Sequence, residues 1–136
     1  MGMRRKAREY VLQALYLSDL SPLEPEKIIK NVTDPHKTEK DMMEFATRLF
    51  EVTLKNKTLI DEKIVSVAKN WEINRMAVLD RNILRMGIAE IIFELDTPLS
   101  VVINEAVELA KSFSTDDSGK FVNGILDKLK QERPSS

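Results

Sequence analysis

The sequence contains no cysteine, one histidine, four glycines and five prolines in 136 residues. Without cysteine there can be no disulfide, thiolate zinc site or cysteine nucleophile, and this suits the reducing cytoplasm, where we expect the protein to be. His36 stands alone beside a proline in a polar stretch, so a Ser-His-Asp site is not expected. The glycines form neither GxxxxGK[ST] nor GxGxxG. We therefore expect no metal, no cofactor and no enzymatic activity.

Long apolar runs are also lacking. None approaches the roughly 20 residues of a membrane span, and the apolar stretch 10–17 is interrupted by Gln13, unlike a signal-peptide core. The net charge is −1, so a nucleic-acid site would have to come from local clustering of basic residues. The length and the 43% hydrophobic content indicate one globular domain over residues 1–136. Residues 1–3 and 131–136 are expected to be flexible ends.

Alternating strand patterns are absent, and helical periodicity covers most of the chain. It predicts an all-α domain of about seven helices. One long helix is expected over about 39–69, bent near Asn56 and Lys57, and a very apolar helix is expected to open at Asp80. Further helices are expected from Pro98, and after Ser114-Thr115, where hydroxyl caps precede two carboxylates. Gly87 and Gly124 fall inside helices, which predicts close helix–helix approaches at both positions.

The segment Arg4 to Leu20 predicts a helix with two functional faces. At about 100° per residue, one apolar stripe should pack on the core; it comprises Ala7, Tyr10, Val11, Ala14, Leu15 and Leu17. The opposite side should be exposed, and it comprises Arg5, Arg8, Leu12 and Tyr16. A helix that only covers a core would carry charge on its far side, not leucine and tyrosine. The basic and aromatic side is therefore a candidate ligand surface.

The basic start of this helix is the best chemical signal in the sequence. Lysine and arginine bind phosphates and release counterions, and a tyrosine on the same side can stack on an unpaired base. A solvated charge run explains the same spacing equally well. Asp116-Asp117 fits helix-start electrostatics better than a metal or acid–base site. The charges around the apolar helix, Asp80, Arg81, Arg85 and Glu90, are explained mainly by salt bridges and otherwise by a partner surface.

Several segments together resemble the NusB family of bacterial transcription antitermination factors. They are RRKAREYVLQALY, the stretch W-x-I-x-R-M-x-x-L-D-R-x-I-L-R-x-G-I-x-E from Trp71 to Glu90, VVINEAVELAKSF and DDSGKFVNGILDKL. The likeness runs from Arg4 to about Leu129, and its middle, from Leu23 to Asn70, matches mainly in length and pattern. Gly119 departs from it, since some relatives have a larger polar residue there.

The resemblance implies an all-helical protein of two helical subdomains that binds single-stranded boxA-type RNA together with NusE, a small-subunit ribosomal protein. It implies a place in the antitermination complex with RNA polymerase during ribosomal RNA transcription. Matched to the family's motifs, the RNA-side residues would be Arg4, Arg5, Lys6, Arg8, Tyr16 and Asp117. The NusE-facing residues would be Asp80, Arg81 and Arg85. Some relatives form homodimers, and the composition fits a monomer or a homodimer.

Two other functions compete with this one. A similar helical module forms part of some ribosomal RNA cytosine methyltransferases, but we expect no methyl-donor domain in a chain ending at Ser136, which could be active in this way only as a fragment of something larger. The third candidate is a non-enzymatic helical interaction protein whose basic end does nothing specific. Salt-dependent RNA binding separates the first function from the third.

Overall fold

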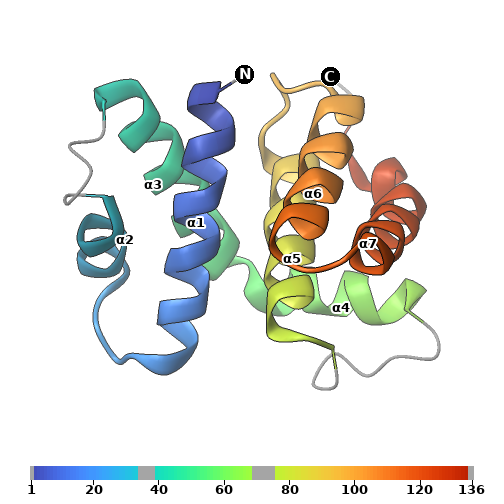
Figure 1. Cartoon of the computed structure of the whole chain (residues 1–136), viewed down its shortest axis with the longest axis horizontal. Helices are drawn as coiled ribbons and strands as arrows, with labels where there is room; N and C mark the ends of the chain where they lie inside the picture. Colours follow the sequence, from blue (N-terminus) through green and yellow to red (C-terminus); the bar gives the residue numbers. More distant parts are fainter. Residues whose placement is uncertain (1, 34–38, 69–75, 135–136) are drawn as a thin grey trace.

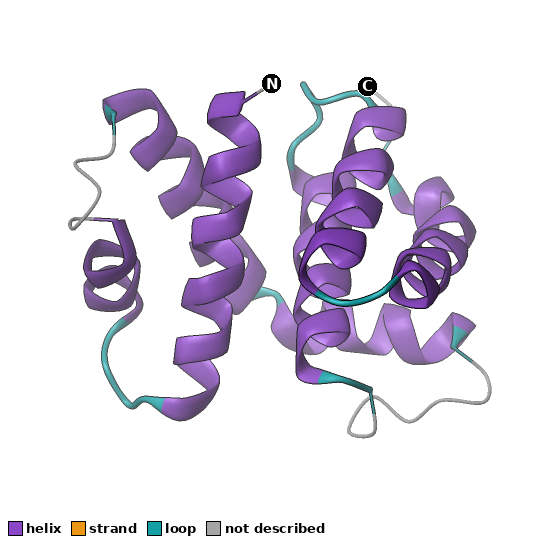
Figure 2. Ribbon diagram, in the orientation of Figure 1, coloured by secondary structure: helices purple, strands orange, loops and turns teal. Residues whose placement is uncertain are grey.

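The computed structural model describes residues 2–33, 39–68 and 76–134, and every regular element among them is a helix (Figure 2). The elements are α1 Gly2–Leu20, α2 Pro25–Thr33, α3 Lys40–Lys55, α4 Lys57–Val67, α5 Val78–Phe93, α6 Leu99–Phe113, α7 Asp116–Leu129 and the 3₁₀ turn η3 Lys130–Glu132. The all-α prediction is confirmed. His36 and Trp71 lie outside the described residues. No helix in the described part of the chain has the length and apolarity needed to cross a bilayer.

Most helix boundaries follow local chemistry. α6 begins directly after Pro98, and Thr115 caps α7 by accepting a hydrogen bond from the Ser118 backbone N–H at 3.0 Å. The helix expected from Asp80 begins two residues earlier, at Val78. The expected bend at Asn56 is a break, where α3 ends and α4 begins. The Asn56 side chain donates to the Val52 carbonyl at 2.9 Å and so competes with the helical pattern.

α5 is the central helix of the molecule. Ten successive residues, 82–91, are buried, because α5 packs against α1, α3, α4, α6 and α7. Figure 1 shows one group of helices, α1, α2 and α3, to the left of α5, and the other group, α6 and α7, in front of it and to its right. A helix with neighbours on every side needs apolar residues all round, and this explains its unusually apolar sequence. The two helix groups thus share one continuous core.

The two helical glycines have different surroundings. A Cβ on Gly87 would lie 3.0 Å from Cδ1 of Leu126, so α5 and α7 do approach closely there, as predicted. A Cβ on Gly124 would meet nothing within 4 Å, and the residue is exposed. The predicted close approach at Gly124 is wrong, because this side of α7 faces solvent.

The end of the chain is held more firmly than predicted. Residues 130–132 form η3, and Lys63 on α4 pairs with Glu132 at 2.6 Å. Arg133 reaches the carboxyl end of α5, where its guanidinium donates to four backbone carbonyls. A flexible end is expected from residue 131, whereas the structure gives residues 131–133 these contacts, because cationic side chains bind carbonyl oxygens at a helix end.

Candidate nucleic-acid interface

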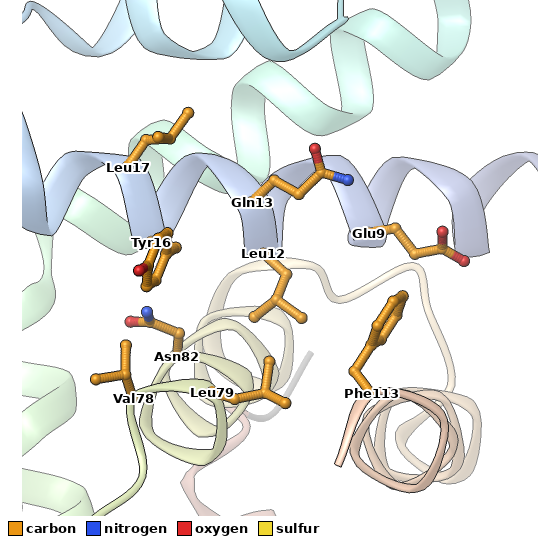
Figure 3. A pocket seen from close by; sticks show the side chains of 9 residues that line it. All are labelled: Glu9, Leu12, Gln13, Tyr16, Leu17, Val78, Leu79, Asn82 and Phe113. Atoms are coloured by element: carbon orange, nitrogen blue, oxygen red, sulfur yellow. The ribbon is translucent and has the colours of Figure 1, made fainter.

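A mostly apolar groove of about 620 Å³ lies between α1, the first turns of α5 and the end of α6 (Figure 3). Its lining residues are Glu9, Leu12, Gln13, Tyr16, Leu17, Val78, Leu79, Asn82 and Phe113. Several apolar side chains remain in solvent here, with exposures of 52% for Tyr16, 52% for Phe113 and 39% for Leu17. Exposed aromatic groups gathered in a concave surface are typical of a binding site.

Tyr16 is exposed as predicted, on the side of α1 that faces α5. In Figure 3 its ring lies on the groove side of α1, above Val78 and Asn82. Phe113 stands at the other end of the groove, where α6 ends. Two aromatic rings with exposed faces can stack on planar groups of a ligand.

The helical-wheel prediction of which α1 residues are buried is only partly correct. Tyr10 and the rest of the predicted stripe are buried except for Leu17, which is exposed in the groove. Leu12, predicted to be exposed, is buried, and it points toward Leu79 (Figure 3). The reason is that α1 packs against α2 and α3 on one side and against α5 on another. The wheel assumed a single buried face.

Arg8 is the main correction among the predicted RNA-side residues. It is 2% exposed, and its Nε and Nη2 donate to the two carboxylate oxygens of Glu90 at 2.7 Å each. Burial raises the pKa of Glu90, and the hydrogen bonds from Arg8 oppose that rise. Because Arg8 is buried in an ion pair with Glu90, it joins α1 to α5 and is not accessible to a phosphate.

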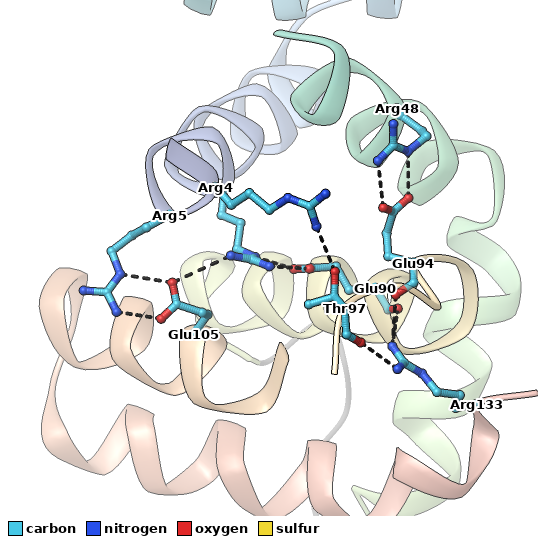
Figure 4. A network of polar contacts seen from close by, with 9 residues as sticks. Arg4, Arg5, Arg48, Glu90, Glu94, Thr97, Glu105 and Arg133 are labelled. Atoms are coloured by element: carbon cyan, nitrogen blue, oxygen red, sulfur yellow. Dashed lines mark hydrogen bonds and ion pairs between the residues drawn. The ribbon is translucent and has the colours of Figure 1, made fainter. Parts of the chain in front are cut away.

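The other three basic residues at the start of α1 are exposed, and each has a partner; Figure 4 shows those of Arg4 and Arg5. Arg4 donates to the Thr97 hydroxyl at 2.9 Å, and its guanidinium lies 4.4 Å from the ring centre of Phe45. Arg5 is paired with Glu105 on α6, and Lys6 lies 3.4 Å from Glu9. The cluster is thus partly neutralised, so its pull on a polyanion is weaker than four free cations would exert.

Asp117 lies in the exposed first turn of α7 and lines a second cavity of about 240 Å³. Asp80, Ser118 and Phe121 also line it. This cavity and the groove flank the first turn of α5, since Ala77 and Asp80 line the cavity while Val78 and Leu79 line the groove. The fold thus brings Asp117 near the surface that carries Tyr16, although the two residues are far apart in sequence.

The three predicted partner-facing residues are not equivalent. Asp80 is half-buried, and one of its oxygens accepts from the Ser118 hydroxyl at 3.3 Å. Arg81 is also half-buried. Arg85 is 6% exposed and donates to both carboxylate oxygens of Asp61 on α4, at 2.7 and 2.9 Å. The prediction of Arg85 as a partner contact is therefore corrected: it is a structural ion pair between α5 and α4.

Sequence reasoning missed several residues of this surface. Phe113 continues the apolar spacing of α6, which favours a core position, yet its side chain is exposed. Glu105 carried no local signal, since its partner Arg5 is 100 residues away. Asn82 follows two charged residues at the start of an apolar run, and this position gives no signal of a groove. Within the described ranges, no group of three or more histidine or acidic side chains could hold a metal ion.

Fold and surface together define a small all-helical protein with an aromatic groove beside the basic start of its first helix. The chain belongs to the NusB family, whose model matches residues 5–131. It is 48% identical over 124 residues to the transcription antitermination protein NusB of Dehalococcoides mccartyi (strain ATCC BAA-2266 / KCTC 15142 / 195), covering 90% of this chain and 86% of that one.

Two solved structures are similar over nearly the whole length. T. maritima NusB superposes with a TM-score of 0.89 at 38% identity, covering 97% of this chain and 93% of that one. A crystal structure of antitermination factors NusB and NusE in complex with dsRNA gives a TM-score of 0.85 at 32% identity, covering 96% and 98%.

Proposed function

We propose that this protein is a transcription antitermination factor that binds boxA-type RNA together with NusE and promotes processive transcription of ribosomal RNA. The observation that carries the proposal is the exposed Tyr16 in an apolar groove beside exposed basic residues, in a chain of the NusB family. The solved NusB–NusE–dsRNA complex supports both classes of partner. In this proposal the protein is not an enzyme; it acts by binding within the transcription complex that contains RNA polymerase.

The RNA would contact two kinds of groups. Arg4, Arg5 and Lys6 would bind phosphates, which hold the strand without reading its sequence. An unpaired base would stack on Tyr16, inside the groove that Phe113 closes at its other end. Asp117 would accept hydrogen bonds from base N–H groups beyond the first turn of α5. Single-stranded RNA fits this arrangement because its bases are free to turn into an apolar groove.

Tyr16→Ala tests the proposal. Because Tyr16 is half exposed, we expect little loss of stability and a loss of RNA affinity of about 1–3 kcal/mol, or roughly 5- to 150-fold. Fluorescence titration with boxA-type and scrambled RNA, with and without NusE, measures the affinity, and thermal melting measures the stability. A melting point that collapses while the folded fraction binds RNA normally would assign Tyr16 to the core and contradict the proposal.

Leu20→Ala is the matched control. Leu20 lies on the same helix and is 67% exposed, but it does not line the groove. Its removal should leave the RNA affinity unchanged. An equal loss of affinity in both variants would show that the loss reflects α1 as a whole and not a base stacked on Tyr16.

The NusE contact is tested separately. We propose that Asp80 and Arg81 face NusE, whereas Arg85 is buried and does not. Arg81→Ala should weaken NusE binding in the absence of RNA, measured by calorimetry. Sedimentation of the protein alone identifies the competing arrangement, in which a second copy of the chain occupies the same surface.

A further inference from the structure

Arg5 and Glu105 form a two-pronged ion pair between α1 and α6 (Figure 4). Nε of Arg5 donates to Oε1 of Glu105 at 3.0 Å, and Nη2 donates to Oε2 at 2.6 Å. The two partners differ in burial, since the Arg5 side chain is 46% exposed and the Glu105 side chain only 2%. A buried carboxylate therefore holds a guanidinium that is half in solvent.

This pairing leaves one edge of the guanidinium available. Glu105 occupies the edge formed by Nε and Nη2. One N–H of Nη1 and the outer N–H of Nη2 form a second edge, which can bind two phosphate oxygens side by side. Among the described residues, none accepts a hydrogen bond from Nη1 of Arg5.

The ion pair between Arg5 and Glu105 should remain intact when Arg5 binds a phosphate. The second cation near Glu105 is Arg8, at 3.7 Å, but Arg8 gives its two short hydrogen bonds to Glu90. The hydrogen bond from Arg5 lowers the pKa of Glu105, so the carboxylate is ionised at neutral pH. If Arg5 left, it would strand a buried charge. A phosphate must therefore bind Arg5 while the pair is intact.

We propose that Glu105 is a positioning residue for RNA binding, which holds the Arg5 guanidinium with its second edge directed toward a phosphate. This inference rests on the proposed function. An arginine that is already ordered loses less side-chain freedom when it binds, so more of the contact energy appears as affinity. Glu105 itself does not touch RNA.

Glu105→Asp tests this because it keeps the charge and withdraws the carboxylate by one methylene. In the protein that retains Arg5, we expect it to weaken boxA-type RNA binding by about 2- to 10-fold. This is the effect of having to immobilise one more side chain on binding. In the Arg5→Ala protein, where nothing is left to position, the same change should have almost no effect. Equal factors in the two backgrounds would overturn the proposal.

Arg5→Lys provides a second variant, which keeps a cation beside the buried Glu105 carboxylate. Lysine keeps the positive charge but lacks the planar fork. We expect the slope of log affinity against log salt to stay close to the parent value, while affinity falls by about 2- to 10-fold and becomes insensitive to Glu105→Asp. Binding as tight as the parent would contradict the proposal.

Glu94→Asp is the matched control. Glu94 is 9% exposed and takes two hydrogen bonds of 2.9 Å from Arg48, through the same Nε and Nη2 edge. This pair joins α3 to the residue that follows α5, and it does not involve Arg5, although Arg48 and Arg4 both lie over the ring of Phe45. Glu94→Asp should loosen a similar ion pair without changing RNA affinity. A loss equal to that of Glu105→Asp would mean that general loosening, not Arg5, is responsible.

NMR of the free protein separates this inference from the proposed function. With ¹⁵N-labelled arginine, the Nε–H of Arg5 should be rigid and slow to exchange in the parent, and mobile in Glu105→Asp. A mobile Nε–H in the parent overturns the inference whatever the RNA result. If the parent does not bind RNA at all, the proposed function fails even though the NMR result stands.

Discussion

Gly87 and Gly124 show how much a single position depends on its neighbours. Both lie inside helices, at a cost of up to about 1 kcal/mol each relative to alanine. At Gly87 the missing side chain makes room for Leu126, whereas at Gly124 it leaves only open solvent. The local sequence does not distinguish the two glycines, but only at Gly87 does close packing explain the absence of a side chain.

The same substitution should therefore have opposite effects at the two positions. Gly124→Ala should stabilise the protein by about 0.5–1 kcal/mol, since alanine fits a helix better and meets nothing. Gly87→Leu should destabilise it by about 1–3 kcal/mol through overpacking against α7, while Gly124→Leu should not. Urea unfolding measures all three. A destabilised Gly124→Leu would mean that this side of α7 is covered.

At the scale of elements, the chain end stabilises the central helix. α5 ends at Phe93, and its last carbonyls lack partners within the helix. Arg133 donates to the carbonyls of Ile91, Thr97, Glu90 and Glu94 at 2.9, 2.6, 3.1 and 3.1 Å. A cation at a helix C-terminus also interacts favourably with the negative end of the helix dipole. The tail thus caps α5 from a distant part of the sequence.

We expect Arg133→Ala to destabilise the protein by about 1–3 kcal/mol, because it removes charge-assisted hydrogen bonds at a half-buried site. Lys130→Ala is the control, since Lys130 is exposed and pairs only with its neighbour Asp127 in the described structure. It should cost less than about 0.5 kcal/mol. Hydrogen exchange should report the loss mainly at the end of α5. Equal losses for both variants would contradict the capping role.

At the scale of the whole molecule, ion pairs join the two helix groups. Arg8 of α1 pairs with Glu90 of α5 at 2.7 Å, Arg48 of α3 with Glu94 at 2.9 Å, and Arg5 with Glu105 of α6. The first pair is almost completely buried. Buried charges cost free energy unless they are paired well, so this junction accepts few arrangements of α1 against α5.

Breaking the buried pair should therefore be costly. Arg8→Ala should lower the free energy of unfolding by about 3–5 kcal/mol, because Glu90 is left buried without its cation. Replacing both residues by methionine should recover much of the loss, since no charge is then stranded. Urea unfolding measures both proteins. A double variant as unstable as Arg8→Ala would show that the loss comes from packing and not from charge.

The pH dependence of stability should reveal the Arg5–Glu105 pair. The pKa of Glu105 is lowered below its usual 4.5 in the folded protein. Its stabilisation is therefore present above the unfolded value and is lost as pH falls through the folded one. The stability difference between the parent and Glu105→Gln should be full at pH 7 and shrink below about pH 4.5. Glu90 is present in both proteins, so its titration largely cancels. A difference independent of pH would contradict the role of the ionised pair.

Local chemistry alone determined most of the helices and part of the site. Pro98 and Thr115 set the starts of α6 and α7, and Asn56 separates α3 from α4, because capping and chain geometry act over a few residues. The exposure of Tyr16 also followed from the periodicity of α1. These features depend only on neighbours in sequence.

Tertiary structure decided which charges are free and which surfaces are open. Arg8 and Arg85 look like surface cations in the sequence, and they are buried because α5 packs against α1 at Arg8 and against α4 at Arg85. Phe113 looks like core and is exposed at the end of α6. A helical period assigns a residue to a face, but the number of helices that cover each face depends on contacts between segments 80 to 100 residues apart. The partners Glu90 and Glu105 come from such contacts.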